Sequence, residues 1–233
     1  MFRLPAFSEL RRHDAQALGS GPGLGGLPEW DLSDLYPSDD APEIARGFDW
    51  LDAACAGFAK TYEGKLATLD APGLLACIRE YEAIDIVAGR LMSFAGLRYY
   101  QMTTDSSRAK FMADAQDRVT NATTPLVFFS LEVNRIEDAA MEALLAASAD
   151  LARYRPVIER MRAMRPHQLS DELERFLHDQ STVGAAAWNR LFDETMAGLS
   201  FAVEGEDDPL PLESTLNLLT DPARPRRQAA AQA

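Results

Sequence analysis

Apolar residues recur at steps of three and four between residues 71 and 102, and this periodicity constrains the fold more than any other feature of the sequence. The stripe consists of Leu74, Ile78, Tyr81, Ile84, Ala88, Leu91, Ala95 and Tyr99. Because this spacing places all of its members on one side of an α-helix, that side must be buried against other elements. Asp70 followed by Pro72 supplies a helix start. The sequence therefore predicts a long helix that ends near Met102.

A second helix is predicted before it, with a start signal from Asp40 to Glu43 and an end at Gly64. In this signal Asp40 is the expected cap and Pro42 lies in the first turn. The apolar stripe of this helix is equally regular, and it consists of Ile44, Phe48, Leu51, Cys55, Phe58 and Tyr62.

A third long helix is predicted after Thr104 and Asp105, which act as its cap, and its apolar stripe continues to Ile136. Pro125 lies inside this pattern and cannot donate a backbone hydrogen bond. Since the stripe continues through the proline, we predict a kink near Ala122 and no break.

Shorter helices are predicted from Asp138 to about Ser148, from Pro156 to about Met164, and after the cap residue Ser170. A cluster of arginines accompanies the middle one, consisting of Arg153, Arg155, Arg160, Arg162 and Arg165. A phosphate site is one interpretation of this cluster. Pairing with the surplus carboxylates, or simple solvation, is favoured over it.

The stretch from Ser181 to Val203 combines a helix from Gly184 onward with a strand at Phe201 and Val203. The helix has a broad apolar stripe around Trp188, and we therefore interpret the Trp188 ring as a core residue and not as a ligand-stacking one. A partner strand near Leu210 to Leu212 would complete a β-hairpin. We expect this stretch to be a junction that follows the N-terminal helices.

After the hairpin, a brief helix is predicted from Glu213 to Leu219, and another starts at Asp221 and Pro222. Pro225 is expected to distort this last helix. Its alanine-rich pattern still continues at Ala233, which suggests a piece of a longer protein.

These elements predict a mainly α protein with a small β-hairpin near residues 199–212. The expected organisation is a flexible or disordered tail over 1–26, a helical domain over 27–198, and the hairpin with the start of a connection over 199–233. In the first part of the helical domain, Trp30, Leu32, Leu35 and Tyr36 are expected to pin an irregular segment to the core.

Composition narrows the possible partners. With 23 Lys and Arg against 36 Asp and Glu, the formal charge is −13, which argues against nucleic acid as a partner. No signal peptide and no membrane-spanning run is found in the sequence, so a cytoplasmic location is expected. Cys55 and Cys77 fall on apolar helix faces and are interpreted as buried, reduced thiols.

No catalytic constellation emerges from the residues themselves. The sequence lacks HExxH, GxSxG and CxxC motifs, and its histidines are His13, His167 and His178. A metal site formed by His167 and His178 with Glu172 or Glu174 is conceivable but not favoured, because the spacing places the two histidines far apart. The prediction is therefore no catalytic, cofactor-binding or metal-binding residue in this chain.

Several segments resemble oligoendopeptidase F, of the thimet-oligopeptidase-like zinc metallopeptidases, in order and spacing. They are WDLSDLYPSD (30–39), YEGKLATL (62–69), YEAIDIVAGRLMSFAGLRYYQMTTD (81–105), YRPVIERMRAMRPHQLSDELERFL (154–177), STVGAAAWNRLFDE (181–194) and LLTDPARPRRQAA (218–230). The resemblance covers about residues 28–230. It implies the N-terminal helical part of a zinc oligopeptidase fold, in which a channel admits short unfolded peptides.

The resemblance also implies that zinc, and the HExxH motif that binds it, belong to a C-terminal catalytic half outside this sequence. We therefore expect the chain to be inactive alone, with that missing half and, through the full-length enzyme, short peptides as its partners. Surfaces meant for the missing half should be apolar and exposed, so self-association is expected. The negative charge further suggests a preference for cationic peptides. The alternatives are a stand-alone helical module that binds peptides or a protein without catalysis, and a structural fragment with no function of its own.

Overall fold

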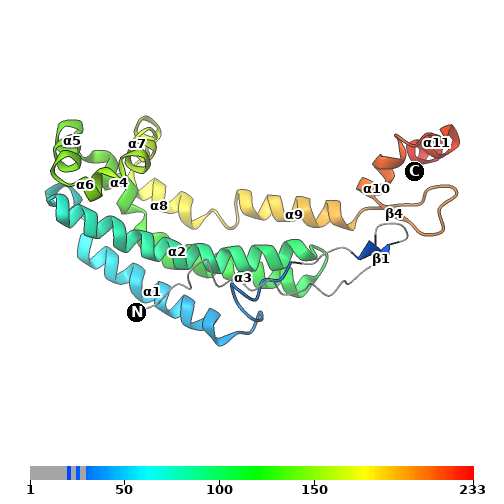
Figure 1. Cartoon of the computed structure of the whole chain (residues 1–233), viewed down its shortest axis with the longest axis horizontal. Coiled ribbons are helices and arrows are strands. Elements are labelled where there is room, and N and C mark those ends of the chain that lie inside the picture. Colours follow the sequence, from blue (N-terminus) through cyan, green and yellow to red (C-terminus); the bar gives the residue numbers. More distant parts are fainter. Residues whose placement is uncertain (1–19, 22–24, 27–29) are drawn as a thin grey trace.

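Three long helices lie side by side in the computed structural model, which describes residues 20–21, 25–26 and 30–233 (Figure 1). They are α1 (Pro42–Tyr62), α2 (Ala71–Gln101) and α3 (Ser106–Thr123), and short connections make successive helices antiparallel. The predicted stripes face the common core, where Leu51, Phe58 and Leu74 have no exposed surface. Burial of each such side chain contributes about 1.5–3 kcal/mol. The mainly α fold is thus confirmed.

The two helix starts differ in how they are capped. Asp70 caps α2 as predicted, since its side chain accepts a hydrogen bond from the Gly73 amide at 2.8 Å. The predicted cap of α1 is wrong, because Ala41 and not Asp40 occupies that position, without a side-chain bond. Pro42 begins the helix and forces the residue before it into an extended conformation, which makes that residue the cap.

The prediction of a kink near Ala122 without a break is wrong, because the α-helix is interrupted around Pro125. After α3 the chain forms a 3₁₀ turn, η3 (Thr124–Leu126), and then α4 (Phe128–Arg135). Thr124 and Val127 keep right-handed helical angles, so the direction of winding continues. Because Pro125 has no amide hydrogen and crowds the carbonyl four residues earlier, the hydrogen bonds change to the shorter spacing, as between the Val127 amide and the Thr124 carbonyl at 3.2 Å.

A cluster of aromatic rings joins α1, α2 and α4. The fully buried Phe58 ring lies 4.9–5.9 Å from four other aromatic rings, those of Tyr62, Tyr81, Phe128 and Phe129. Tyr81 also stacks on Phe129, with ring centroids 4.2 Å apart. This cluster fixes where α4 sits on the three-helix layer.

Glu132 of α4 holds the connection between α1 and α2. Its carboxylate accepts hydrogen bonds from the Gly64 amide at 2.6 Å and from the Leu66 amide at 3.1 Å. Gly64 has φ +77°, a conformation that L-residues rarely adopt, and it ends α1 as predicted. Leu66 begins the 3₁₀ turn η2 (Leu66–Thr68) and is fully buried.

Short helices cover one end of the long layer: α5 (Asp138–Ala147), the unpredicted α6 (Ala149–Ala152), α7 (Arg155–Arg162) and the 3₁₀ turn η4 (Arg165–His167) (Figure 1). Three of the five arginines of the cluster pair within the protein, as favoured from the sequence. Arg155 bonds Glu142, and Arg162 donates to the Val133 and Ile136 carbonyls and to Asp138. Arg165 also forms an ion pair with Asp138.

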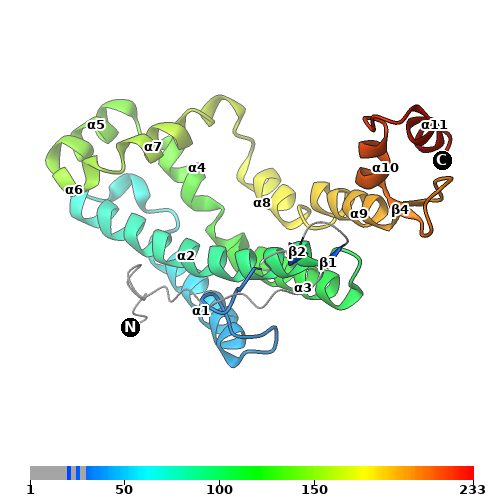
Figure 2. The ribbon, with the colours of Figure 1, turned by 45° about the vertical axis from the view of Figure 1, so that its right-hand side comes forward.

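Two more helices, α8 (Asp171–Asp179) and α9 (Ala185–Gly198), run along the bundle to a small C-terminal unit (Figures 1 and 2). The cap of α8 is Ser170, as predicted, with its hydroxyl 3.4 Å from the Leu173 amide. The predicted hairpin is confirmed: β3 (Ser200–Phe201) pairs antiparallel with β4 (Leu210–Pro211).

The chain then forms α10 (Leu212–Leu218) and α11 (Arg224–Gln232). The distortion expected from Pro225 is wrong. Ala223 caps α11, so Pro225 falls in the first turn, where its missing amide hydrogen breaks no helical bond. Buried Val203 and Ala230 lie in this C-terminal unit, outside the main core.

Two aromatic residues predicted to be buried are exposed. Trp188 on α9 has 70% of its surface exposed, and Trp30 has 59%. Trp30 contributes its carbonyl instead of its ring to the fold, accepting a bond from Gln101 Nε2 at 3.0 Å. Trp188 is exposed because its helix has no element of the described chain packed over that side, and α9 contains no buried residue.

The predicted tail over 1–26 lies outside the described residues, except for the paired strands β1 (Ser20–Gly21) and β2 (Gly25–Gly26). The proposed boundaries at 26 and 198 therefore stay predictions. Among the described helices, none combines the length and the apolar character that crossing a membrane requires.

Candidate functional site

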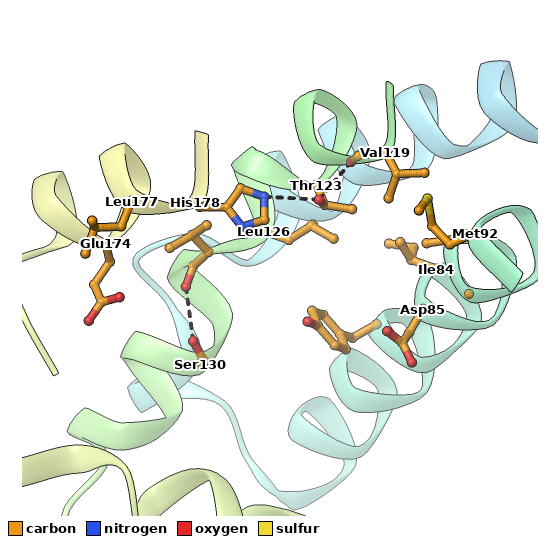
Figure 3. A pocket seen from close by; sticks show the side chains of 14 residues that line it. Ile84, Asp85, Met92, Val119, Thr123, Leu126, Ser130, Glu174, Leu177 and His178 are labelled. Carbon is orange, nitrogen blue, oxygen red and sulfur yellow. Dashed lines mark hydrogen bonds between the residues drawn. The ribbon is translucent and has the colours of Figure 1, made fainter. Parts of the chain in front are cut away.

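A groove of about 650 Å³ opens between α2, the α3–η3–α4 segment and α8 (Figure 3). We call it the α2–α3–α8 groove. From α2 it is lined by Tyr81, Ile84, Asp85, Ala88, Gly89 and Met92; from the middle segment by Val119, Thr123, Leu126, Val127 and Ser130; and from α8 by Glu174, Leu177 and His178. The volume lies within the range of small-molecule and cofactor pockets, about 300–1,000 Å³.

The wall of the groove on the bundle side is apolar and rigid. Ile84, Ala88 and Leu126 are buried members of the core stripes, and Tyr81 is held by its stacking on Phe129. The lining residues of the middle segment come from both sides of Pro125, in α3, η3 and α4. The wall is therefore formed before any ligand arrives.

His178 of α8 is anchored to the α3 end. Its Nε2 lies 3.2 Å from the Thr123 hydroxyl and 3.3 Å from the Thr120 carbonyl. A carbonyl oxygen only accepts, so Nε2 carries a hydrogen and donates to it. Thr123 in turn donates to the Val119 carbonyl at 2.8 Å, which leaves its oxygen to accept from His178. The imidazole thus positions α8 across the groove.

Polar contacts carry the rest of this attachment. The Thr124 hydroxyl donates to Asp179 Oδ1 at 2.5 Å, and Arg175 and Arg135 form ion pairs with Glu63 and Asp171, respectively. Helix α8 itself has no buried residue. Exposed pairs of this kind contribute little each, about 0–1 kcal/mol, so α8 is positioned on the bundle without being part of its core.

Two carboxylates face the groove from opposite sides, Asp85 on α2 and Glu174 on α8 (Figure 3). One oxygen of Glu174 accepts from the Leu169 amide at 2.8 Å, which fixes the start of α8. Within residues 30–233, Asp85 forms no hydrogen bond and no salt bridge. Burial of the Tyr81 ring, and to a smaller extent the negative charge of Asp85, raise the pKa of Tyr81.

Next to the groove, α8 and α9 present a large set of exposed apolar side chains, which we call the α8–α9 apolar surface. Phe176 is 56% exposed, Phe192 63% and Trp188 70%. The remaining members are Leu173, Leu177, Val183, Leu191 and Leu199. Exposed large apolar side chains gathered on two successive helices are typical of an interaction surface.

The described residues bring together no cluster of three or more His, Cys, Asp or Glu that could hold a metal ion. His178 uses one ring nitrogen on Thr123 and Thr120, and His13 lies outside the described residues. The zinc implied by the family resemblance therefore does not fit the described part of this chain. Cys55 and Cys77 are buried and free, and burial raises their thiol pKa values to about 11 and about 12. Neither is a thiolate nucleophile near neutral pH.

Fold and site together define a mainly α-helical region that has a ligand-sized groove, an uncovered apolar surface and, among the residues described, no metal-binding cluster. Comparison with known proteins shows what this region is similar to. Residues 132–201 match the family model described as Oligopeptidase F.

Oligopeptidase PepF of Bacillus subtilis (strain 168) is 27% identical over 179 residues, which cover 76% of this chain and 26% of that protein. Group B oligopeptidase PepB of Streptococcus agalactiae serotype III (strain NEM316) is 25% identical over 213 residues, covering 88% of this chain and 34% of that protein. The chain spans about a quarter to a third of the length of these curated relatives.

The crystal structure of oligoendopeptidase-F from Enterococcus faecium has the same fold, with a TM-score of 0.72 and 21% identity over 84% of this chain and 38% of that one. The predicted resemblance is therefore confirmed. The chain is similar to an N-terminal part of oligoendopeptidase F-like proteins.

Sequence reasoning named His178 and Glu174 only as members of an unfavoured metal site, and it predicted no site at this groove. Its lining comes from segments up to 97 positions apart, Tyr81 to His178, and each lining residue looks locally like part of a helical stripe or a polar surface. The one available signal was Pro125, a proline inside a continuous apolar stripe, which lies in the middle segment of the groove lining.

Proposed function

We propose that this chain forms one wall of the peptide channel in an oligoendopeptidase F-like peptidase that hydrolyses short unfolded peptides. The observation that carries the proposal is the α2–α3–α8 groove with the α8–α9 apolar surface beside it. A groove open on one side, next to an uncovered apolar surface, suits a wall that another part of the protein completes. The similarity to proteins named as oligopeptidases supports peptides as the ligands.

In this proposal the chain supplies shape and no chemistry. Zinc, when bound by the catalytic part of such an enzyme, would activate water for attack on the peptide bond. The described residues of this chain hold no zinc ligand set, so we assign them no step of the reaction and propose that the chain alone is inactive. Its own contribution is to bind a peptide in the groove and to exclude folded proteins by size. We place the protein in the cytoplasm, a location with which the buried free thiols agree.

The test combines hydrolysis with cross-linking. The purified chain is incubated with short unstructured peptides and added Zn²⁺, and products are sought by mass spectrometry. Peptides that carry a photoreactive group are then cross-linked and the attachment sites mapped. We expect no cleavage, and attachment to residues of α2, η3 and α8 that line the groove. Zinc-dependent cleavage by the chain alone would overturn the proposal that it is inactive. Cross-linking only outside the groove would overturn the proposal that the chain forms a wall of the peptide channel.

A further inference from the structure

The α2–α3–α8 groove combines an apolar wall with charges of a single sign. Asp85 and Glu174 are its carboxylates, and no Lys or Arg is among the residues that line it. The surrounding chain has a formal charge of −13, which adds to the negative potential of the groove. Its chemistry is therefore complementary to a ligand with an apolar body and a cationic end.

We propose that the groove selects peptides with a lysine or arginine side chain, whose aliphatic stem packs on the apolar wall and whose charged end lies at Asp85, while Glu174 adds negative charge from the opposite side of the groove. This inference rests on the proposed function, since it assumes that peptides enter the groove. It adds the chemical class of peptide and the residues that recognise it. Lysine and arginine commonly bury their methylene stems while their charge stays at a polar rim.

The apolar part of the groove has the right composition for such a stem. Ile84, Ala88 and Met92 follow one another along one side of α2, and Val119 lies opposite on α3 (Figure 3). Asp85 is adjacent in sequence to Ile84, so the carboxylate lies at the start of this apolar strip. A stem lying along α2 would therefore end close to a negative charge.

The two carboxylates contribute differently. Glu174 is half-buried and has one oxygen engaged with the Leu169 amide, which holds its side chain in place. Asp85 is exposed and, within residues 30–233, free of hydrogen bonds and salt bridges, so a bound cation would displace no partner. Asp85 is thus the better residue to change, because its loss breaks no contact of the fold.

The experiment measures binding and not cleavage, and it uses the chain as it is. Three fluorescent hexapeptides differ at one central position, which is lysine, norleucine or glutamate, and their affinities are measured by anisotropy at low and high salt. We expect the lysine peptide to bind about tenfold more tightly than the norleucine peptide at low salt, with the difference shrinking at high salt.

Asp85→Asn is expected to weaken lysine-peptide binding about fivefold and to leave norleucine-peptide binding unchanged, as for loss of one exposed ion pair. Asp117→Asn is the matched control, since Asp117 is an exposed aspartate of α3 that does not line the groove. It should leave both affinities unchanged.

The outcomes separate this inference from the proposed function. Equal binding of the lysine and norleucine peptides, at an affinity that a groove variant such as Gly89→Trp abolishes, would overturn the charge selection and leave the peptide groove intact. Equal effects of Asp85→Asn and Asp117→Asn would also overturn it, because only general charge would then matter. Failure of all three peptides to bind would contradict both proposals.

Discussion

Glu132 offers the sharpest test of how this bundle is held together. Its two carboxylate oxygens accept from the amides of Gly64 and Leu66, at 2.6 and 3.1 Å, across a sequence separation of more than sixty residues. We consider the substitutions Glu132→Ala and Glu132→Gln. The first removes both acceptors, and the second keeps one oxygen but turns an amide NH₂ donor toward the other backbone amide.

The magnitude follows from the number of bonds and from burial. A hydrogen bond to a charged group contributes about 1.5–3 kcal/mol, and the Leu66 amide would be left unpaired at a fully buried residue. Because Glu132 is itself only partly buried, we expect values toward the lower end: a loss of about 3 kcal/mol in the free energy of unfolding for Glu132→Ala. Glu132→Gln should lose about half of that.

Urea denaturation followed by circular dichroism measures the loss, and amide hydrogen exchange of Gly64 and Leu66 locates it. Glu204→Ala is the control, since Glu204 is exposed in the hairpin loop. The reasoning is refuted if Glu132→Ala costs less than about 1 kcal/mol, the size of an ordinary surface change, or if the two amides keep their protection.

Three further predictions concern the core, the thiols and the apolar surface. Phe58→Ala should lower the free energy of unfolding by about 3–5 kcal/mol in urea denaturation, because the fully buried ring contacts four others; a loss below about 2 kcal/mol would contradict this. Cys55 and Cys77 should resist iodoacetamide at pH 8.5 until urea is added, and rapid labelling of the native protein would contradict their burial. Their folded pKa values of about 11 and about 12 lie above the ordinary 9.0, so the free energy of unfolding should fall as the pH rises from 9 through 11. The chain should self-associate at about 100 µM in light scattering, and Trp188→Ser with Phe192→Ser should reduce this; a monomeric parent chain would contradict it.

The groove and the apolar surface share one structural cause. Helix α8 is attached by His178, Asp179, Arg175 and Asp171 through polar contacts, and its apolar residues are therefore free to face outward or into the groove. Leu177 does both, since it lines the groove and is 51% exposed. If another part of the protein covers this surface, as proposed, it also closes the groove.

Much of the fold could be predicted from residues close together in sequence. Asp70 and Ser170 cap their helices, Gly64 ends α1 with a positive φ, and the hairpin forms between Phe201 and Leu210 as predicted. Each of these depends on backbone conformation and hydrogen bonds within a few residues. The predictions at Asp40 and Pro225 were wrong because the helix starts one or two residues later than expected, next to a proline in each case.

Burial, in contrast, was decided by the tertiary structure. The stripe around Trp188 has the same periodicity as the stripe around Ile84, yet Ile84 is 2% exposed and Trp188 is 70% exposed. Periodicity states only that one side of a helix is apolar, whereas burial requires another element to pack against that side. Helix α2 has α1 and α3 as neighbours, while the apolar side of α9 has none in the described chain. The groove depends in the same way on helices brought together from distant parts of the sequence, so its residues were visible only once α2, α3 and α8 had been placed side by side.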